Sequence, residues 1–378
     1  MTTRRTRIFE FAEMMNNSRS RYLIILLLVM VCPAFGQAKV ATEAEIAARF
    51  SPVFYQALGE HPRSDYITNF DFDGDWRGDN NWDHTDNKEF PLRAYIYYAV
   101  SETISHYFIH YAVFHPRDYK GGEAKGLILS ELIRQGAKEL GDHDPTGMMA
   151  ESAAAHENDM EGCLIVVAKN GKLPPRAVYV ESLHHNIFSS YLTGESATKS
   201  YSAFKTENEH PLLYVEPKGH GIEAYTGDEK QTAGREFLIY KYKGKAEDPE
   251  KQKAGKVGYE LLPIKTTLWP KAQIGTESAG TTFGATHDYS LISIDVVQPN
   301  GRSLVEKFNV GGLGSAFLGK AGGVNMARPP WGWFDINHRG DPLGLWFFDP
   351  ARIVRRDFNQ GESFSTAYVR LPFWTAKN

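Results

Sequence analysis

The sequence predicts a mainly β protein, an antiparallel two-sheet sandwich of the jelly-roll kind with a few peripheral helices. Short runs of β-branched and aromatic residues recur along the chain, and clusters of Gly, Pro, Asn and Asp separate them. Helical segments do not alternate with these runs, which argues against a parallel α/β sheet. The 42% hydrophobic content is enough to form a large core.

Only two segments have a helical pattern. Residues 41–50 contain Thr42 as an N-cap with Glu45 three residues later, and residues 127–140 carry apolar side chains at helical spacing. The predicted strands are 93–100, 106–114, 163–168, 176–181, 212–216, 236–243, 257–262 and 289–297. The short stretch between the first two strands predicts an antiparallel hairpin, and the polar stretch 243–255 predicts a solvated loop.

The N-terminal residues resemble a signal peptide. The apolar run at residues 23–31 is too short for a bilayer-spanning helix, which needs roughly 20 residues. Arginines precede the run and small residues follow it, so we expect a leader over 1–36 with cleavage near Gln37. The remaining residues 37–378 would form one domain, secreted or periplasmic, without a transmembrane span.

Charge and cysteine content narrow the function classes. The formal net charge is −4, and the chain has no long basic run, which argues against nucleic acid as a partner. Of the two cysteines, Cys32 would leave with the leader, so Cys163 would pack in the core without a disulfide partner. Nucleotide-binding and serine-hydrolase motifs are missing from the sequence.

The most informative stretch is residues 155–167, where His156, Asp159 and Glu161 lead into an apolar strand. Strand geometry would direct Asp159, Glu161 and Cys163 to one side. Unpaired carboxylates at the end of a buried strand would cost several kcal/mol, so a bound divalent cation is the preferred explanation. Carboxylate oxygens suit Ca²⁺, Mg²⁺ or Mn²⁺. The imidazole ligand is also compatible with Zn²⁺. A buried polar network is the alternative.

This stretch resembles the Gly-His-Arg-His-Asp-Trp-Glu motif of the necrosis-inducing secreted proteins and their vacuolar protein sorting-associated relatives. The resemblance implies a β-sandwich whose acidic and histidine residues hold a divalent cation, with His156, Asp159 and Glu161 as the ligands here. The motif's first Gly, its Arg, its second His and its Trp are replaced in this chain. An additional upstream aspartate of the family has no clear counterpart, although Asp142 and Asp144 lie in the corresponding region.

Two later segments are similar to the vacuolar-sorting branch, and with them the resemblance spans residues 155–225. It implies that His184 or His185, His220 and Glu223 line the same cleft as the cation. A histidine there, such as His185 or His220, would be the candidate catalytic acid or base.

A second acidic cluster has the spacing of a calcium loop. Asn69, Asp71 and Asp73 alternate, a glycine follows, and Asp75 would supply a backbone carbonyl. The pattern fails at position twelve, where Asn80 replaces the bidentate Glu. A turn whose carboxylates accept local hydrogen bonds is the equal alternative.

The aromatic segment 327–353 contains Trp331 and Trp333, which could form a stacking surface for a glycan or lipid headgroup. We favour the alternative, in which these rings fill the end of the sandwich while Arg328 and Asp335 form rim contacts.

Three functions fit these features. The first is a binding module that holds a glycan or a polar headgroup at the cation cleft, with Trp331 and Trp333 framing it. The second is a metal-dependent hydrolase that uses the same cation and a nearby histidine. The third is a protein whose cations only stabilise loops.

Overall fold

The computed structural model describes residues 41–118, 155–169, 174–193, 202–229, 237–276, 279–290, 292–319, 327–358 and 363–373. The chain folds into a compact unit that extends from Glu43 to Asn378. The predicted leader, the predicted helix at 127–140, and Asp142 and Asp144 lie outside the described residues. Within the described ranges, no helix combines the length and the apolar character needed to cross a bilayer.

Strands dominate the described part of the chain, and all eight predicted strands are confirmed. One large sheet contains β1 (Val53–Gln56), β2 (Tyr95–Thr103), β3 (His106–Asp118), β4 (His156–Ala168), β5 (Arg176–His184), β6 (Ile187–Thr193), β7 (Ser202–Phe204), β8 (Thr206–Glu207), β9 (His210–Val215), β10 (Ile222–Ala224), β11 (Leu238–Tyr242), β12 (Lys256–Pro263), β14 (Ile292–Val297), β15 (Ser303–Phe308) and β17 (Tyr368–Arg370). A separate pair consists of β13 (Phe283–Asp288) and β16 (Gly312–Phe317).

The described helices are short. They are α3 (Glu43–Arg49), α4 (Asn81–His84), α7 (Leu268–Ala272), α8 (Ala279–Thr282), α9 (Leu345–Phe348) and α10 (Pro350–Asp357), with 3₁₀ turns η1 (Pro62–Asp65), η4 (Pro249–Lys251), η5 (Lys253–Gly255), η6 (Ile264–Thr266), η7 (Pro330–Gly332) and η8 (Ile336–His338). Helix α3 confirms the first predicted helix. The polar stretch 243–255 is a loop that contains η4 and η5.

The sheet topology contradicts the predicted antiparallel two-sheet sandwich. Fifteen of the described strands belong to one mixed sheet with the main order β10-β9-β1-β11-β12-β2-β3-β4-β5-β6-β7. The β2–β3 hairpin is antiparallel as predicted, but β12 pairs with β2 in parallel, and β1 pairs in parallel with β9. The sandwich prediction was wrong because periodicity locates strands without identifying their partners, and these pairings join segments far apart in sequence.

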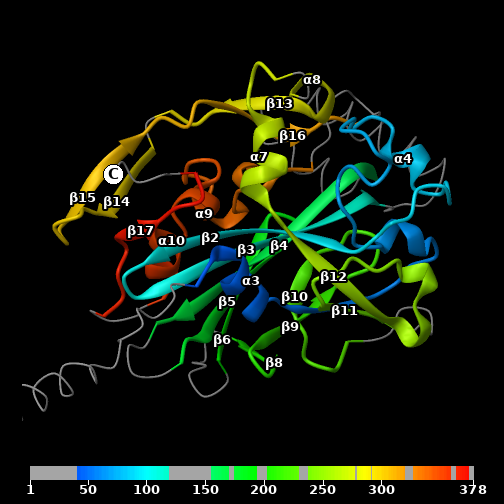
Figure 1. The fold of residues 1–378 in the computed structure, drawn as a ribbon, viewed down its shortest axis with the longest axis horizontal. Coiled ribbons are helices and arrows are strands. Elements are labelled where there is room, and N and C mark those ends of the chain that lie inside the picture. The colour runs from blue at the N-terminus through cyan, green and yellow to red at the C-terminus, as the bar shows by residue number, and fades with distance from the viewer. Residues whose placement is uncertain are drawn as a thin grey trace, which may run out of the picture. The chain divides into compact units, whose positions relative to one another are not determined.

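The central strands of the sheet are buried on both faces. Along β4, Met160, Leu164 and Val166 pack into one core with α7, α9 and α10, whereas Cys163 and Ile165 pack into a second core with α3, β1 and β11. Figure 1 shows β2, β3 and β4 in the middle of the view, with α3 near them and the orange-red helices α9 and α10 beside them. This arrangement confirms that Cys163 is a core residue, fully buried with a free thiol.

Candidate functional site

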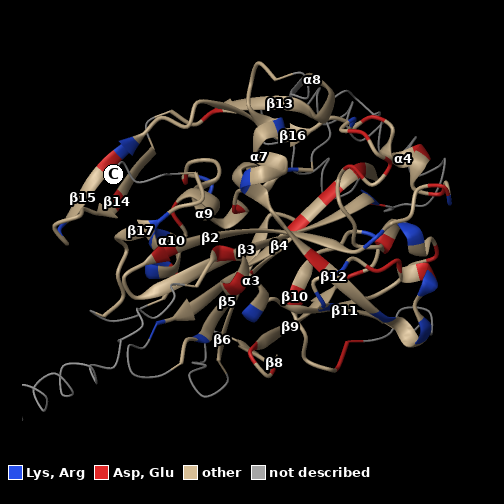
Figure 2. Ribbon diagram, viewed as in Figure 1, with Lys and Arg blue, Asp and Glu red and all other residues tan. Residues whose placement is uncertain are grey.

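The first half of β4 carries the predicted motif, and it runs antiparallel to the end of β3. His156 lies opposite Asp118, and Asp159 lies opposite His115. Asn158 has a φ of 58°, an unusual left-handed conformation in a strand. Its side-chain Nδ2 donates to the carbonyl oxygens of Gly78 and Leu318, which fixes this backbone. Figure 2 shows acidic residues along the end of β4 that is directed towards α4.

An open hollow lies at this end of β4. It brings together three carboxylates, two imidazoles and one guanidinium with an apolar wall; its lining comprises Asp118, His156, Asp159, Met160, Glu161, Leu183, His185, Asn186, Ala327, Arg328 and Trp333. The three residues predicted as cation ligands, His156, Asp159 and Glu161, therefore line one hollow. The His156 Nε2 atom lies 3.9 Å from Asp118 Oδ2.

Asp159 also forms an ion pair with His220, whose ring is fully buried. His220 Nδ1 donates to Asp159 Oδ2 at 2.8 Å, and His220 Nε2 donates to Asp65 Oδ1 at 3.2 Å. The His115 ring stacks on the His220 ring with centroids 3.7 Å apart, and His115 Nε2 donates to Gln56 Oε1. The Asp65 carboxylate also accepts hydrogen bonds from the backbone amides of Gly59 and Lys218. The imidazole of His220 is thus held between two carboxylates.

The electrostatics of this pair follow from its surroundings. Burial alone would lower the pKa of His220, but the hydrogen bonds to Asp159 and Asp65 raise it to about 9. Burial likewise opposes ionisation of Asp159, but the hydrogen bond from His220 holds the pKa of that carboxyl well below its usual range. Burial and the neighbouring His220 charge lower the pKa of His115. The structure therefore supports a charged His220 stacked on a neutral His115.

A second titratable cluster lies at the β5–β6 turn. His185 Nε2 lies 2.6 Å from Glu216 Oε1, and His184 Nε2 lies 3.5 Å from Glu216 Oε2. Glu223 Oε1 accepts from His184 Nδ1 at 3.0 Å. Among the described residues, His184, His185 and Glu216 form the group whose potential metal-ligating atoms all lie within 4.8 Å of one another. His156, Asp159 and Glu161 do not meet that spacing.

Hydrogen bonds determine the charge of this cluster. Those with Glu216 and Glu223 raise the pKa of His184 to about 9. Burial opposes ionisation of Glu216, but its hydrogen bonds with the two histidines hold its pKa well below the usual range. His184 and Glu223 contact each other and His184 faces Glu216, whereas neither His184 nor Glu223 lines the hollow that contains Asp159.

The two tryptophans assigned to the cleft are core residues. Trp331 is fully buried and its Nε1 donates to the Gly314 carbonyl, and Trp333 is 2% exposed with its Nε1 donating to the Met160 carbonyl. Trp333 borders the hollow, whereas Trp331 does not. Arg328 lines the hollow, and its guanidinium lies over the Phe334 ring. Asp335 lines a separate hollow beside Trp346.

The predicted calcium loop forms local hydrogen bonds. Asp71 accepts from the side chain of Asn69, Asp73 accepts from His84 Nδ1 at 2.6 Å, and Asp75 accepts from the Arg77 amide. These bonds agree with the alternative of an Asx-rich turn.

Sequence reasoning missed three site residues, Asp65, Asp118 and Glu216. Asp118 is the last residue of β3, and Glu216 directly follows β9. A charged residue after an apolar run is a sequence signal that could have identified both as site candidates. Asp65 lies in a 3₁₀ turn with no such signal. Its role depends on loops that approach each other only in the folded chain.

Comparisons with known proteins gave structural matches alone. No family model and no curated protein matches the chain. Among solved structures, one entitled "Toxin fold for microbial attack and plant defense" has 13% identity and a TM-score of 0.26, covering 49% of this chain and 69% of that one. Necrosis and Ethylene inducing Protein 2 from the causal agent of cocoa's witches' broom disease has 12% identity and a TM-score of 0.27, with coverages of 50% and 72%. NLPPya in complex with mannosamine has 13% identity and a TM-score of 0.28, with coverages of 64% and 79%.

These matches accord with the necrosis-inducing part of the resemblance seen in the sequence. Nothing in them supports the vacuolar-sorting part.

Proposed function

We propose that the protein binds a divalent cation in the hollow at the end of β4 and, through that cation, a hydroxyl-rich headgroup such as that of a glycan. His156, Asp159 and Glu161 would be the ligands. The observation that supports this function most directly is the lining of the hollow, which gathers Asp118 and Arg328 with these three side chains. Carboxylate oxygens suit Ca²⁺, Mg²⁺ or Mn²⁺.

The rest of the lining suits a polar ligand. Arg328 provides a cationic donor beside the carboxylates, and Trp333 and Leu183 provide an apolar wall. Sugars combine hydroxyl groups with apolar C–H faces, so a wall of this kind next to a cation can hold them.

Binding is favoured over hydrolysis by the position of one candidate catalytic histidine, His220. His220 is fully buried between Asp65 and Asp159, so it does not reach a bound ligand. A hydrolase needs a titratable group within reach of the reacting atoms.

The test is calorimetric titration of chelator-treated protein with Mn²⁺ and with Ca²⁺. We expect Asp159→Asn to weaken cation binding roughly tenfold or more, the scale found when metal sites are perturbed. Asp288→Asn, which changes an exposed carboxylate on β13, is the matched control and should bind as the wild type does. Unaltered affinity in Asp159→Asn would contradict the assignment.

Ligand binding is tested separately with glucosamine and mannosamine, in the presence and absence of the cation. Glucosamine and mannosamine are the sugars in two of the similar structures. Cation-dependent sugar binding that is lost in Asp159→Asn supports the proposal. A large loss of thermal stability on chelation, with no sugar binding in either condition, would instead indicate a structural cation.

A further inference from the structure

The β5–β6 turn brings two neighbouring histidines to the same side of the chain. Successive residues of a strand normally point to opposite faces. Here His184 ends β5, and the two turn residues His185 and Asn186 have φ values of 51° and 61°. Such left-handed residues are typical of the tight turns that join hairpin strands. The reversal directs both imidazoles to Glu216.

The chain that follows β9 makes room for this arrangement. Glu216 directly follows β9, and Gly221 precedes β10. A Cβ atom on Gly221 would lie 2.2 Å from His184 Cδ2, so a larger residue at position 221 would displace the His184 ring. Glycine at this position therefore leaves room for the His184 ring.

Each histidine has a carboxylate facing its other ring nitrogen. His184 directs Nε2 towards Glu216 and hydrogen-bonds Glu223 through Nδ1 at 3.0 Å. His185 directs Nε2 towards Glu216, and its Nδ1 lies 3.8 Å from Glu161 Oε1. Metal-bound histidines almost always have such a carboxylate or carbonyl partner, which orients the ring and raises its basicity.

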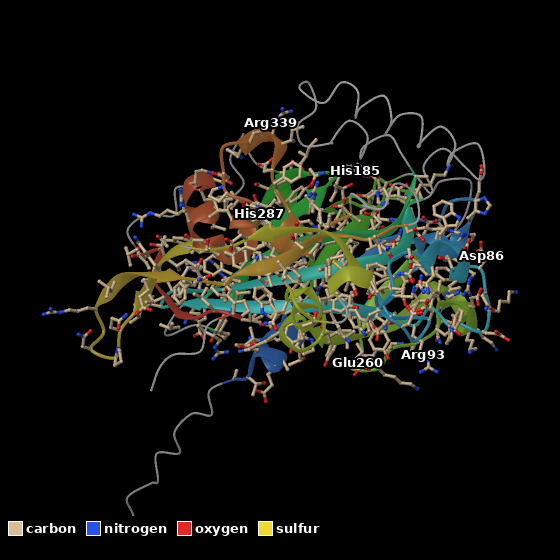
Figure 3. The ribbon with its side chains drawn as sticks, turned by 90° about the horizontal axis from the view of Figure 1, so that it is seen from above. Asp86, Arg93, His185, Glu260, His287 and Arg339 are labelled. Atoms are coloured by element: carbon tan, nitrogen blue, oxygen red, sulfur yellow. The ribbon has the colours of Figure 1, made fainter. Side chains whose placement is uncertain are left out.

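We propose that His184 Nε2, His185 Nε2 and the Glu216 carboxylate form a second metal site, selective for a transition-metal ion of the Zn²⁺ type. Two imidazoles and one carboxylate match the donor set of zinc sites that keep a fourth position for water or a ligand. The three side chains are 28%, 24% and 28% exposed, so solvent reaches that position. In Figure 3, His185 lies on the upper side of the view, away from Glu260.

This site differs from the hollow at β4 in chemistry, although His185 borders both. The hollow offers mainly carboxylate oxygens, which suit hard cations, whereas the turn offers two ring nitrogens, which suit Zn²⁺. Glu161 lies between the two, because it lines the hollow and faces His185. Asp159 lines only the hollow and Glu216 belongs only to the turn cluster, so we expect substitutions of these two residues to separate the occupation of the two sites.

The experiment titrates tag-free full-length protein with Zn²⁺ in competition with a fluorescent chelator. We expect Glu216→Gln to weaken Zn²⁺ binding at least tenfold, and Glu223→Gln to weaken it roughly tenfold to a hundredfold through loss of the carboxylate behind His184. Glu260→Gln is the matched control, because it changes a half-buried glutamate on β12 that lies away from His185. It should bind Zn²⁺ as the wild type does.

Co²⁺ reports the geometry independently of affinity, because a four-coordinate site gives a far stronger visible absorption than an octahedral one. We expect that absorption in the wild type and in Asp159→Asn, and its loss in Glu216→Gln. Circular dichroism confirms that each variant is folded. Zn²⁺ affinity that is equal in wild type and Glu216→Gln would overturn the inference, as would loss of Zn²⁺ binding in Asp159→Asn but not in Glu216→Gln. Failure of Mn²⁺ or Ca²⁺ binding at the hollow would leave this site supported and contradict the proposed function alone.

Discussion

At the scale of single residues, the interior contains titratable groups whose surroundings keep them neutral. Burial raises the pKa of Glu181 to about 8, although Trp346 Nε1 donates a 2.7 Å hydrogen bond to it. Burial also lowers the pKa of His110 to about 4, and its Nε2 donates to the Trp346 carbonyl. Trp346 therefore forms hydrogen bonds with one acid, Glu181, and one base, His110. Both side chains are uncharged near neutral pH.

Glu181 should make stability fall as the pH rises. Its carboxyl has a pKa of about 8 when folded and about 4.5 when unfolded, so the folded state binds more protons between these values. Its contribution is complete below pH 4.5 and is lost as the pH rises through about 8, at no more than about 1.4 kcal/mol per pH unit. Urea unfolding at several pH values should show a flatter profile for Glu181→Gln. Parallel profiles for the variant and the wild type would contradict this.

At the scale of elements, β4 carries the predicted cation ligands and also packs against the Trp333 ring through Gly162. Gly162 lies between Glu161 and Cys163, and the Trp333 ring packs directly against it. A Cβ atom there would lie 2.3 Å from Trp333 Cη2 and 2.6 Å from the Tyr111 carbonyl oxygen. The strand can therefore contact the indole closely only because residue 162 has no side chain.

Gly162→Ala should destabilise the protein by about 1–3 kcal/mol, because an added methyl in a packed core forces its neighbours to move. Gly340→Ala is the control, since a Cβ atom at that exposed glycine would meet nothing within 4 Å. Denaturant unfolding of both variants measures the difference. Equal midpoints would show that the Trp333 contact is not close in solution.

At the scale of the whole folded unit, two hydrophobic cores share the same strands. Trp331, Phe108 and Leu164 belong to one core, and Tyr111 and Ile165 belong to the other. Because β3 and β4 contribute alternate residues to both, neither core can form without them. The unit is expected to unfold cooperatively.

Trp331→Ala should lower the free energy of unfolding by about 3–5 kcal/mol, because it empties a fully buried site. Both cores should be lost together, so far-ultraviolet circular dichroism and tryptophan fluorescence should give coincident transitions. Two separated transitions would mean that the core on the α3 side folds on its own.

The sequence predicted the local features of this protein well. Alternating apolar residues located the strands, Thr42 and Glu45 marked the beginning of α3, and the spacing of Asp159, Glu161 and Cys163 placed them along one strand. Each of these depends on neighbours within a few residues, and the chain's local geometry is sufficient to specify them.

Only the tertiary structure decided which strands pair, which carboxylate His220 meets and which residues gather around Glu216. These depend on contacts such as that between His220 and Asp65, which are 155 residues apart. Strand periodicity is the same whether a partner is parallel, antiparallel, near or distant, so it could not distinguish one mixed sheet from two antiparallel ones. The sequence determined where polar side chains interrupt apolar strands, and folding determined which of them share a site.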